Sequence, residues 1–128
     1  MPWQPAAILY PDAELVMCDK TRGLVNTDVY IGRTIPRTWV KAVIWNRIGG
    51  TNEPPVDHAL MQLRVFAPTD QACADLTRQI QARLPTICDG DPVISMTVTG
   101  GPTDLGSEPS PMRQILFNTT LRGHQQSQ

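Results

Sequence analysis

Residues Thr38 to Ile48 alternate regularly, which predicts a β-strand, and both faces of that strand are partly apolar. A strand with one solvated face carries a polar set on that face, whereas this strand has aromatic or aliphatic residues on each side. Both faces of the central sheet are therefore expected to be covered. The first face carries Trp39, Lys41, Val43, Trp45 and Arg47, and the second carries Val40, Ala42, Ile44, Asn46 and Ile48.

Four other stretches are predicted to join this strand in one sheet. A short one lies at 29–31, and three longer ones lie at 57–67, 93–99 and 113–122. Loops join most consecutive strands, so the sheet is expected to be mostly antiparallel. With an amphipathic helix packed on one face and a short N-terminal helix, the prediction is an α+β fold with about five strands.

Two helices are indicated by the residues at their ends. Pro11 opens a short one with negative charge close behind it, and Gly23 stops it. Thr69 is predicted to cap the second helix, which ends at Pro85 and has apolar positions at helical spacing. The residues predicted to be buried in the core are Val43 or Ile44, Leu63, Val65, Leu76, Ile80, Val98, Ile115 and Phe117.

The 128 residues are predicted to form one domain (1–128), with an extended N-terminal arm at 1–10 and a flexible tail at 124–128. The chain has 12 prolines and 9 glycines, so many turns and long connections are expected. The connections at 49–56 and 100–111 stand out, and the first is predicted to be too long for a tight hairpin. Long loops in a compact domain are usually functional or disordered.

No arrangement of catalytic or metal-binding residues is evident in the sequence. Cys18, Cys73 and Cys88 are spaced too irregularly for a disulfide framework or a zinc site, and unpaired cysteines suit a reducing cytoplasm. His58 has no evident partner, and Asp89 and Asp91 flank Gly90 as turn residues do. We therefore expect no enzyme activity, no cofactor and no metal.

Charge and hydropathy argue against three further classes. A net charge of −1 argues against a protein that coats nucleic acid, because such a protein needs surplus cations to displace counterions. The apolar run at 6–10 is far shorter than the ~20 residues of a transmembrane helix. No Lys or Arg precedes it, so a secretory signal is not expected either.

The charges that remain are separated along the chain. Four acids and no Lys or Arg lie between Pro85 and Met112, whereas six cations and three acids lie between Arg22 and Arg64. Solvated loops would explain this simply. A surface of two signs would also suit head-to-tail contacts between copies, which close into rings when the rotation permits. The residues predicted for such an interface are Arg33, Arg37 and Arg47 on one side and Asp89 and Asp91 on the other.

The order and layout of these elements resemble the tail terminator proteins of long-tailed bacteriophages, also called tail completion or minor tail proteins. The resemblance covers roughly Pro11 to Gly123. It lies in the helix that starts at Pro-Asp, the strand that ends in Gly49-Gly50, and the strand that closes with Ala67-Pro68-Thr69 before an amphipathic helix. It continues in Gly100-Gly101-Pro102 and in a final strand ending in Leu121-Arg122-Gly123.

The resemblance implies a structural virion protein rather than an enzyme. Members of the family form a hexameric ring on the head-proximal end of the tail tube, where they end tube polymerisation and present a surface to the head connector. The implied partners are other copies of the chain, the tail tube protein and the head-closure or connector protein. DNA is only cargo passing through the ring, and no membrane is involved. The implied location is the virion tail, assembled in the host cytoplasm.

The two long connections are the predicted docking loops for the tube or the connector. The residues singled out in them are Gly49, Gly50, Glu53, Gly100, Gly101, Asp104 and Glu108. Two alternatives remain open: a head-closure or neck protein of similar size, and a small cytoplasmic α+β domain that binds a ligand or catalyses a reaction. A ring former runs as a large species on size exclusion, whereas a small monomeric domain does not.

Overall fold

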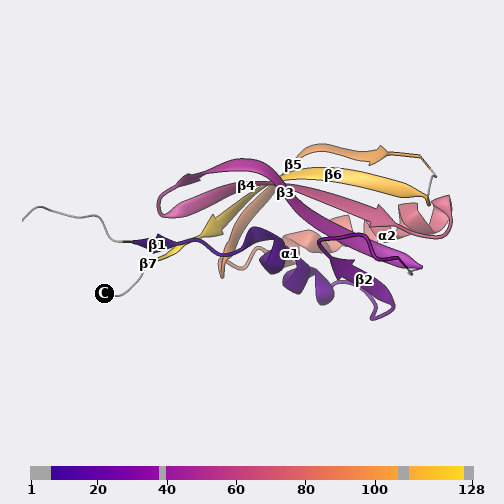
Figure 1. Cartoon of the computed structure of the whole chain (residues 1–128), viewed down its shortest axis with the longest axis horizontal. Helices are drawn as coiled ribbons and strands as arrows, with labels where there is room; N and C mark the ends of the chain where they lie inside the picture. Colours follow the sequence, from indigo (N-terminus) through magenta and orange to yellow (C-terminus); the bar gives the residue numbers. More distant parts are fainter. Residues whose placement is uncertain (1–6, 38–39, 107–109, 126–128) are drawn as a thin grey trace, which may run out of the picture.

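The computed structural model describes residues 7–37, 40–106 and 110–125, and shows an elongated α+β domain with both helices on one face of a twisted sheet (Figure 1). The sheet has five strands in the order β2-β3-β4-β6-β5. Only β2 and β3 run parallel, so the predicted class and the mostly antiparallel sheet are confirmed. The strands are β2 (Val29–Gly32), β3 (Lys41–Glu53), β4 (Val56–Phe66), β5 (Val93–Asp104) and β6 (Met112–Arg122).

Both helices begin at the side-chain caps that helix N-termini require. Helix α1 (Ala13–Arg22) has Asp12 as its cap, which accepts a hydrogen bond from the Leu15 backbone N–H at 3.3 Å, so Pro11 lies before the cap. Helix α2 (Asp70–Arg83) has Thr69 as its cap, as predicted, and Thr69 accepts from Ala72 N–H at 3.1 Å. The 3₁₀ helix η1 (Leu84–Ile87) continues from α2.

The main core lies between the helices and the sheet. Trp45 of β3 is fully buried there, and its indole N–H donates to the Thr21 hydroxyl of α1 at 2.9 Å. The predicted core residues are buried with one exception, since Val98 is 44% exposed. Val98 lies on the end strand β5, whereas α2 packs on β4 and β6. The confirmed core residues are Val43, Ile44, Leu63, Val65, Leu76, Ile80, Ile115 and Phe117.

A second, smaller cluster lies on the opposite face of the sheet. It consists of Ala42, Ile44 and Phe66, all buried, with Met112 packed against them. Two parallel strands cannot be joined by a hairpin, and the residues that directly follow β2 lie against this face of the sheet. The side chain of Asn46 donates to the Arg33 carbonyl at 2.9 Å and so ties this connection to the sheet. The expectation that both faces are covered therefore holds at this end of β3.

The predicted loop at 49–56 is wrong. Strand β3 continues to Glu53 and β4 begins at Val56, so only Pro54 and Pro55 make the turn. Glycine inside a strand marks a bulge or a close backbone approach. Here the register shifts between Arg47 and Gly49, and Gly50 has φ 107°. The two glycines thus bend a continuous hairpin and do not end it.

The predicted loop at 100–111 is also too long. Strand β5 runs through Gly100 and Gly101 to Asp104, with register shifts on either side of Gly100. Gly101 has φ 90°, and a Cβ there would lie 2.4 Å from the Gln114 carbonyl oxygen. A positive φ and so close an approach are open to glycine alone. The pair Gly100-Gly101 therefore carries the strand past a bulge, and Asp104 still pairs with Arg113.

The two ends of the described chain are tied together, which corrects the predicted arm and tail in part. Strand β1 (Ile8–Leu9) pairs antiparallel with β7 (His124–Gln125). Gly123 directs the chain there, because its backbone N–H donates to the Pro55 carbonyl at 2.9 Å. The predicted arm residues 1–6 and tail residues 126–128 lie outside the described residues.

Truncating Leu76 is expected to lower the free energy of unfolding by ~2–5 kcal/mol, because Leu76→Ala removes a side chain that α2 buries against the sheet. Leu105, which is 40% exposed, provides the matched control, and Leu105→Ala should change stability by less than about 0.5 kcal/mol. Urea melts measure both values. Equal midpoints for the two variants would show that α2 does not seal this face.

Candidate assembly surfaces

Strands β2 and β5 are the two ends of the sheet, and each pairs with another strand on one side only. The register of β5 is uninterrupted only over Ser95–Val98, which matches the four residues of β2. Natural edge strands are commonly protected by lysine, by proline or by bulges. Strand β5 has bulges on both sides of Ser95–Val98 and a proline, Pro102, farther along, but no Lys, Arg or Pro lies within Ser95–Val98 itself. This four-residue stretch is therefore open to pairing with another strand.

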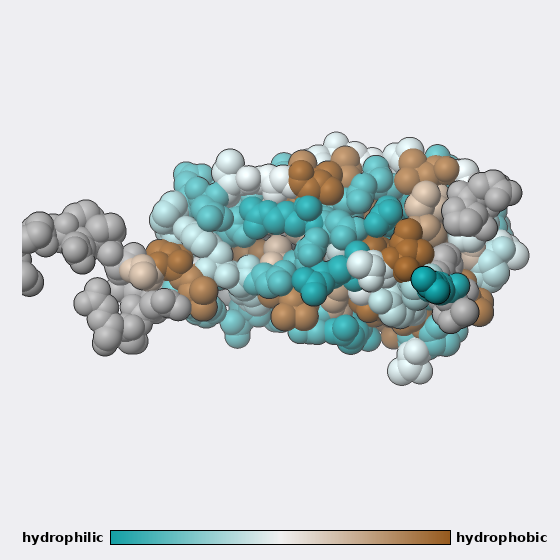
Figure 2. Space-filling view, in the orientation of Figure 1, coloured by the Kyte–Doolittle hydropathy of each residue, from teal (hydrophilic) through white to brown (hydrophobic). Residues whose placement is uncertain are grey.

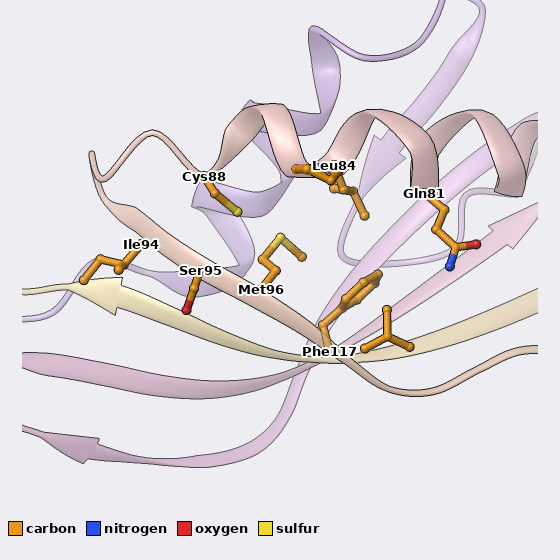
Figure 3. A pocket seen from close by; sticks show the side chains of 9 residues that line it. Gln81, Leu84, Cys88, Ile94, Ser95, Met96 and Phe117 are labelled. Atoms are coloured by element: carbon orange, nitrogen blue, oxygen red, sulfur yellow. The ribbon is translucent and has the colours of Figure 1, made fainter.

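A hollow of about 330 Å³ lies beside β5 on the helix side of the sheet. Figure 3 shows Leu84 and Cys88 of the helical segment facing Met96 and Phe117 of the sheet across it. Burial raises the pKa of the Cys88 thiol above its ordinary value, and the backbone N–H of Met96 partly opposes this. The polar side chains in the lining are Gln81 and Ser95, and the apolar ones come from Leu84, Pro85, Cys88, Ile94, Met96, Val98 and Phe117.

The other edge has a hollow of its own, of about 380 Å³, where α1 lies beside β2. Leu15 and Tyr30 line it and are 51% and 39% exposed. Ile31, the neighbour of Tyr30 on β2, also lines this hollow and packs against the main core. On the face that Figure 2 shows, hydrophobic residues reach the surface in several separate patches among hydrophilic ones. Both sheet edges thus combine an open strand with exposed apolar side chains.

Of the predicted interface residues, Arg33 and the two aspartates lie at opposite edges of the sheet. Arg33 directly follows β2, and its guanidinium lies 3.5 Å from the Asp12 carboxylate and 3.7 Å from that of Glu14. Asp89 and Asp91 precede β5. Lys20 donates to Asp89 at 2.8 Å, and this hydrogen bond holds the pKa of Asp89 below its ordinary value. Within one copy these opposite charges do not meet.

The remaining predicted cations differ from each other. Arg37 is exposed on the connection between β2 and β3. Arg47, in contrast, forms a two-pronged ion pair with Asp57, with N–O distances of 2.6 and 2.8 Å, and Asp57 is 1% exposed. The Asp57 hydrogen bonds raise the pKa of Arg47. The charge of Arg47 is therefore paired within the copy, and its predicted place at an interface stays a prediction.

The Arg47 side chain also binds the bulge. Its Nε donates to the Gly49 carbonyl at 3.0 Å, while its backbone N–H donates to the Glu14 carboxylate of α1 at 2.9 Å. This role of Arg47 was not predicted, although the sequence carries a signal for it. Arg47 alternates with Trp45 and Asp57 alternates with Ala59, so both charges occupy positions on the core face of neighbouring strands.

The predicted docking residues lie at the two ends of the long strands. Gly49, Gly50 and Glu53 lead to the turn between β3 and β4, whereas Gly100, Gly101 and Asp104 lead to the connection between β5 and β6. Figure 1 shows these two connections at opposite ends of the long axis. Glu108 lies outside the described residues.

His58, for which the sequence offered no partner, has two in the structure. Its Nε2 lies 3.1 Å from the Glu53 carboxylate, and its Nδ1 lies 3.3 Å from the Thr120 hydroxyl. Thr120 is its cross-strand neighbour on β6. The three side chains stand on the helix-free face of the sheet, and none of them lines either hollow described above. They stabilise the β3–β4 hairpin against β6.

Neither a metal site, nor a membrane-spanning helix, nor a known relative was found for the described chain. Within residues 7–37, 40–106 and 110–125, no three His, Cys, Asp or Glu side chains are grouped so that they could hold a metal ion. Neither helix of the described chain has the length and apolar character needed to cross a membrane. No protein-family model matches the sequence, and no curated protein is significantly similar to it.

Proposed function

We propose that this protein is a structural subunit that assembles head to tail into a ring and caps the head-proximal end of a phage tail tube. The observation that carries the proposal is a sheet open at two different edges, with hairpin connections at both ends of its strands. The identity of the two partners, the tail tube and the head connector, and the number of six copies are taken from the resemblance of the chain to tail terminator proteins.

The two edges support a ring rather than a two-fold dimer. An isologous contact uses one patch twice, whereas a head-to-tail contact joins two different patches and leaves one of each free for the next copy. The β5 edge carries an apolar hollow and follows two aspartates, and the β2 edge carries α1 and precedes Arg33. Unlike edges of this kind suit the head-to-tail contact, which closes when the rotation permits.

The two strand ends support an adaptor with two different faces. In a ring whose axis follows the strands, the Pro54–Pro55 turn faces one side and the β5–β6 connection faces the other. One face would then meet the tail tube and the other the head connector. Long hairpins that bring different residues to each face provide this without a second domain, and DNA passes through the centre.

Purified protein is expected to run as a large species on size exclusion at high concentration or with tube ends present, and to show rings in negative stain. Added to polymerising tail tube protein of the same phage, it should bind one tube end and shorten the tubes in proportion to its concentration. An unrelated protein of the same size is the control. Tube length is measured on micrographs.

The two alternative functions predict different results in the same experiment. A head-closure protein forms rings and binds connector, but it leaves tube length unchanged. A small ligand-binding or enzymatic domain stays a single copy at every concentration and leaves the tubes unchanged, and this outcome would overturn the proposal.

A further inference from the structure

We propose that the ring closes through its sheets: Ser95–Val98 of β5 in one copy pairs antiparallel with β2 (Val29–Gly32) of the next. This inference rests on the proposed head-to-tail assembly and specifies the contact. The occupant of the open β5 edge is thus a second copy of the same chain. Three independent features of the two edges support this pairing.

The first feature is strand direction. Strands β2 and β3 are parallel and each later neighbour reverses, so β5 runs opposite to β2 within one copy. If the ring axis is parallel to the strands, rotation about it leaves the direction of every strand unchanged. The β2 edge of the next copy therefore arrives antiparallel to β5, and antiparallel pairing is the more stable kind per residue. The same rotation keeps the helices of both copies on one side of the sheet.

The second feature is the match between faces. When Ser95–Val98 and Val29–Gly32 are aligned antiparallel over all four residues, Met96 lies opposite Ile31 and Thr97 lies opposite Tyr30. Met96 pairs with Thr119 and Ile31 pairs with Val43, so both residues point to the helix side. Thr97 pairs with Asn118 and Tyr30 pairs with Ala42, so both point to the helix-free side. A shift of the register by one residue would place opposed side chains on different faces of the sheet.

The third feature is the chemistry beside the strands. In this register the turn that holds Asp89 and Asp91 comes next to Arg33, because Ser95 lies opposite Gly32. Arg33 is exposed and its nearest carboxylates within the copy are 3.5 and 3.7 Å away, so it can reach an additional acid. Leu15 of α1 would face the apolar hollow over β5, near Ile94. Charges and apolar side chains therefore complement each other across the contact.

Disulfide trapping tests the contact directly. In a Cys88→Ala background, Tyr30→Cys combined with Thr97→Cys places one thiol on each edge, and the native Cys18 and Cys73 are buried. Opposed residues on paired strands have Cβ atoms ~4.5–5.5 Å apart, close enough to be bridged with small adjustment. Because the two thiols of one copy lie at opposite edges, only a link between copies can form. Mild oxidation should convert most of the protein into a ladder of multimers on non-reducing gels.

Matched variants control the trapping. Tyr30→Cys with Ser95→Cys keeps both thiols on the helix-free side but two residues out of register, where Cβ atoms are ~7–8 Å apart, and should link severalfold less. Each single variant should give no ladder beyond a dimer. Circular dichroism confirms that all variants are folded.

The outcomes separate this contact from the proposed function. A ladder specific to the Tyr30 and Thr97 pair establishes the contact, whether or not the protein caps tubes. Rings and shortened tubes without that ladder would overturn the contact and leave the proposed function standing. Protein that neither forms rings nor forms a ladder would overturn both.

Discussion

Replacing Arg47 with glutamate is expected to destabilise the fold by about 3–5 kcal/mol, because the substitution sets a second carboxylate against the buried Asp57. Removing one partner of a buried ion pair leaves an uncompensated charge, and here the hydrogen bond from Arg47 Nε to the Gly49 carbonyl at the bulge is lost as well. The Arg47 side chain is 32% exposed, so solvent screening favours the lower end of this range. Urea unfolding followed by circular dichroism measures the effect.

Arg37 provides the matched control for this experiment. It is an exposed arginine, so Arg37→Glu should change the free energy of unfolding by no more than about 0.5 kcal/mol. Combining the two reversals to test a charged interface would therefore change stability and assembly together, whereas Arg37→Glu alone reports on assembly. A midpoint for Arg47→Glu equal to that of Arg37→Glu would refute the structural role of the Arg47–Asp57 pair.

The substitution Gly50→Ala is expected to lower the free energy of unfolding by about 3 kcal/mol. The substitution Gly49→Ala at the adjacent position should leave it nearly unchanged. Gly50 has φ 107°, and an added Cβ would lie 2.0 Å from the His58 carbonyl oxygen of the partner strand. A strained backbone of this kind costs ~1–3 kcal/mol, and the clash adds to it. A Cβ at Gly49 would make only ordinary contact with Leu60, at 3.7 Å.

Comparing the two variants separates the effect of backbone geometry from the effect of replacing a glycine with an alanine. Both variants lose one glycine and gain one methyl group, so their unfolded states are nearly equivalent. Thermal or urea melts of the pair give the difference directly. Similar stabilities would mean that the hairpin relaxes around Gly50, and that the register of β3 and β4 beyond the bulge is not fixed by it.

The sequence predicted the class of the fold because two of its signals are strong. Alternation in β4 and β6, and helical spacing in α2 after the Thr69 cap, are periodic over more than ten residues. Each buried face is then determined by the period alone. Val98 was misplaced because alternation identifies a face but does not show how far a helix extends across the sheet.

The glycine pairs were misinterpreted for a related reason. Gly49-Gly50 and Gly100-Gly101 have the composition of loops, yet a bulge needs the same conformational freedom within a strand. Local sequence cannot distinguish the two, because the partner strand decides whether the ladder resumes. In the same way, the Arg47–Asp57 pair joins positions on neighbouring strands, so it becomes evident only once the register is known.

The short pairing of β1 with β7 makes the two ends of the domain unlike. Both strands lie beside the Pro54–Pro55 turn, to which Gly123 is hydrogen-bonded. The described chain therefore begins and ends at the same end of the domain. In the ring proposed above, whose axis follows the strands, the β1–β7 pairs would all lie at one rim, so the two rims would differ in outline.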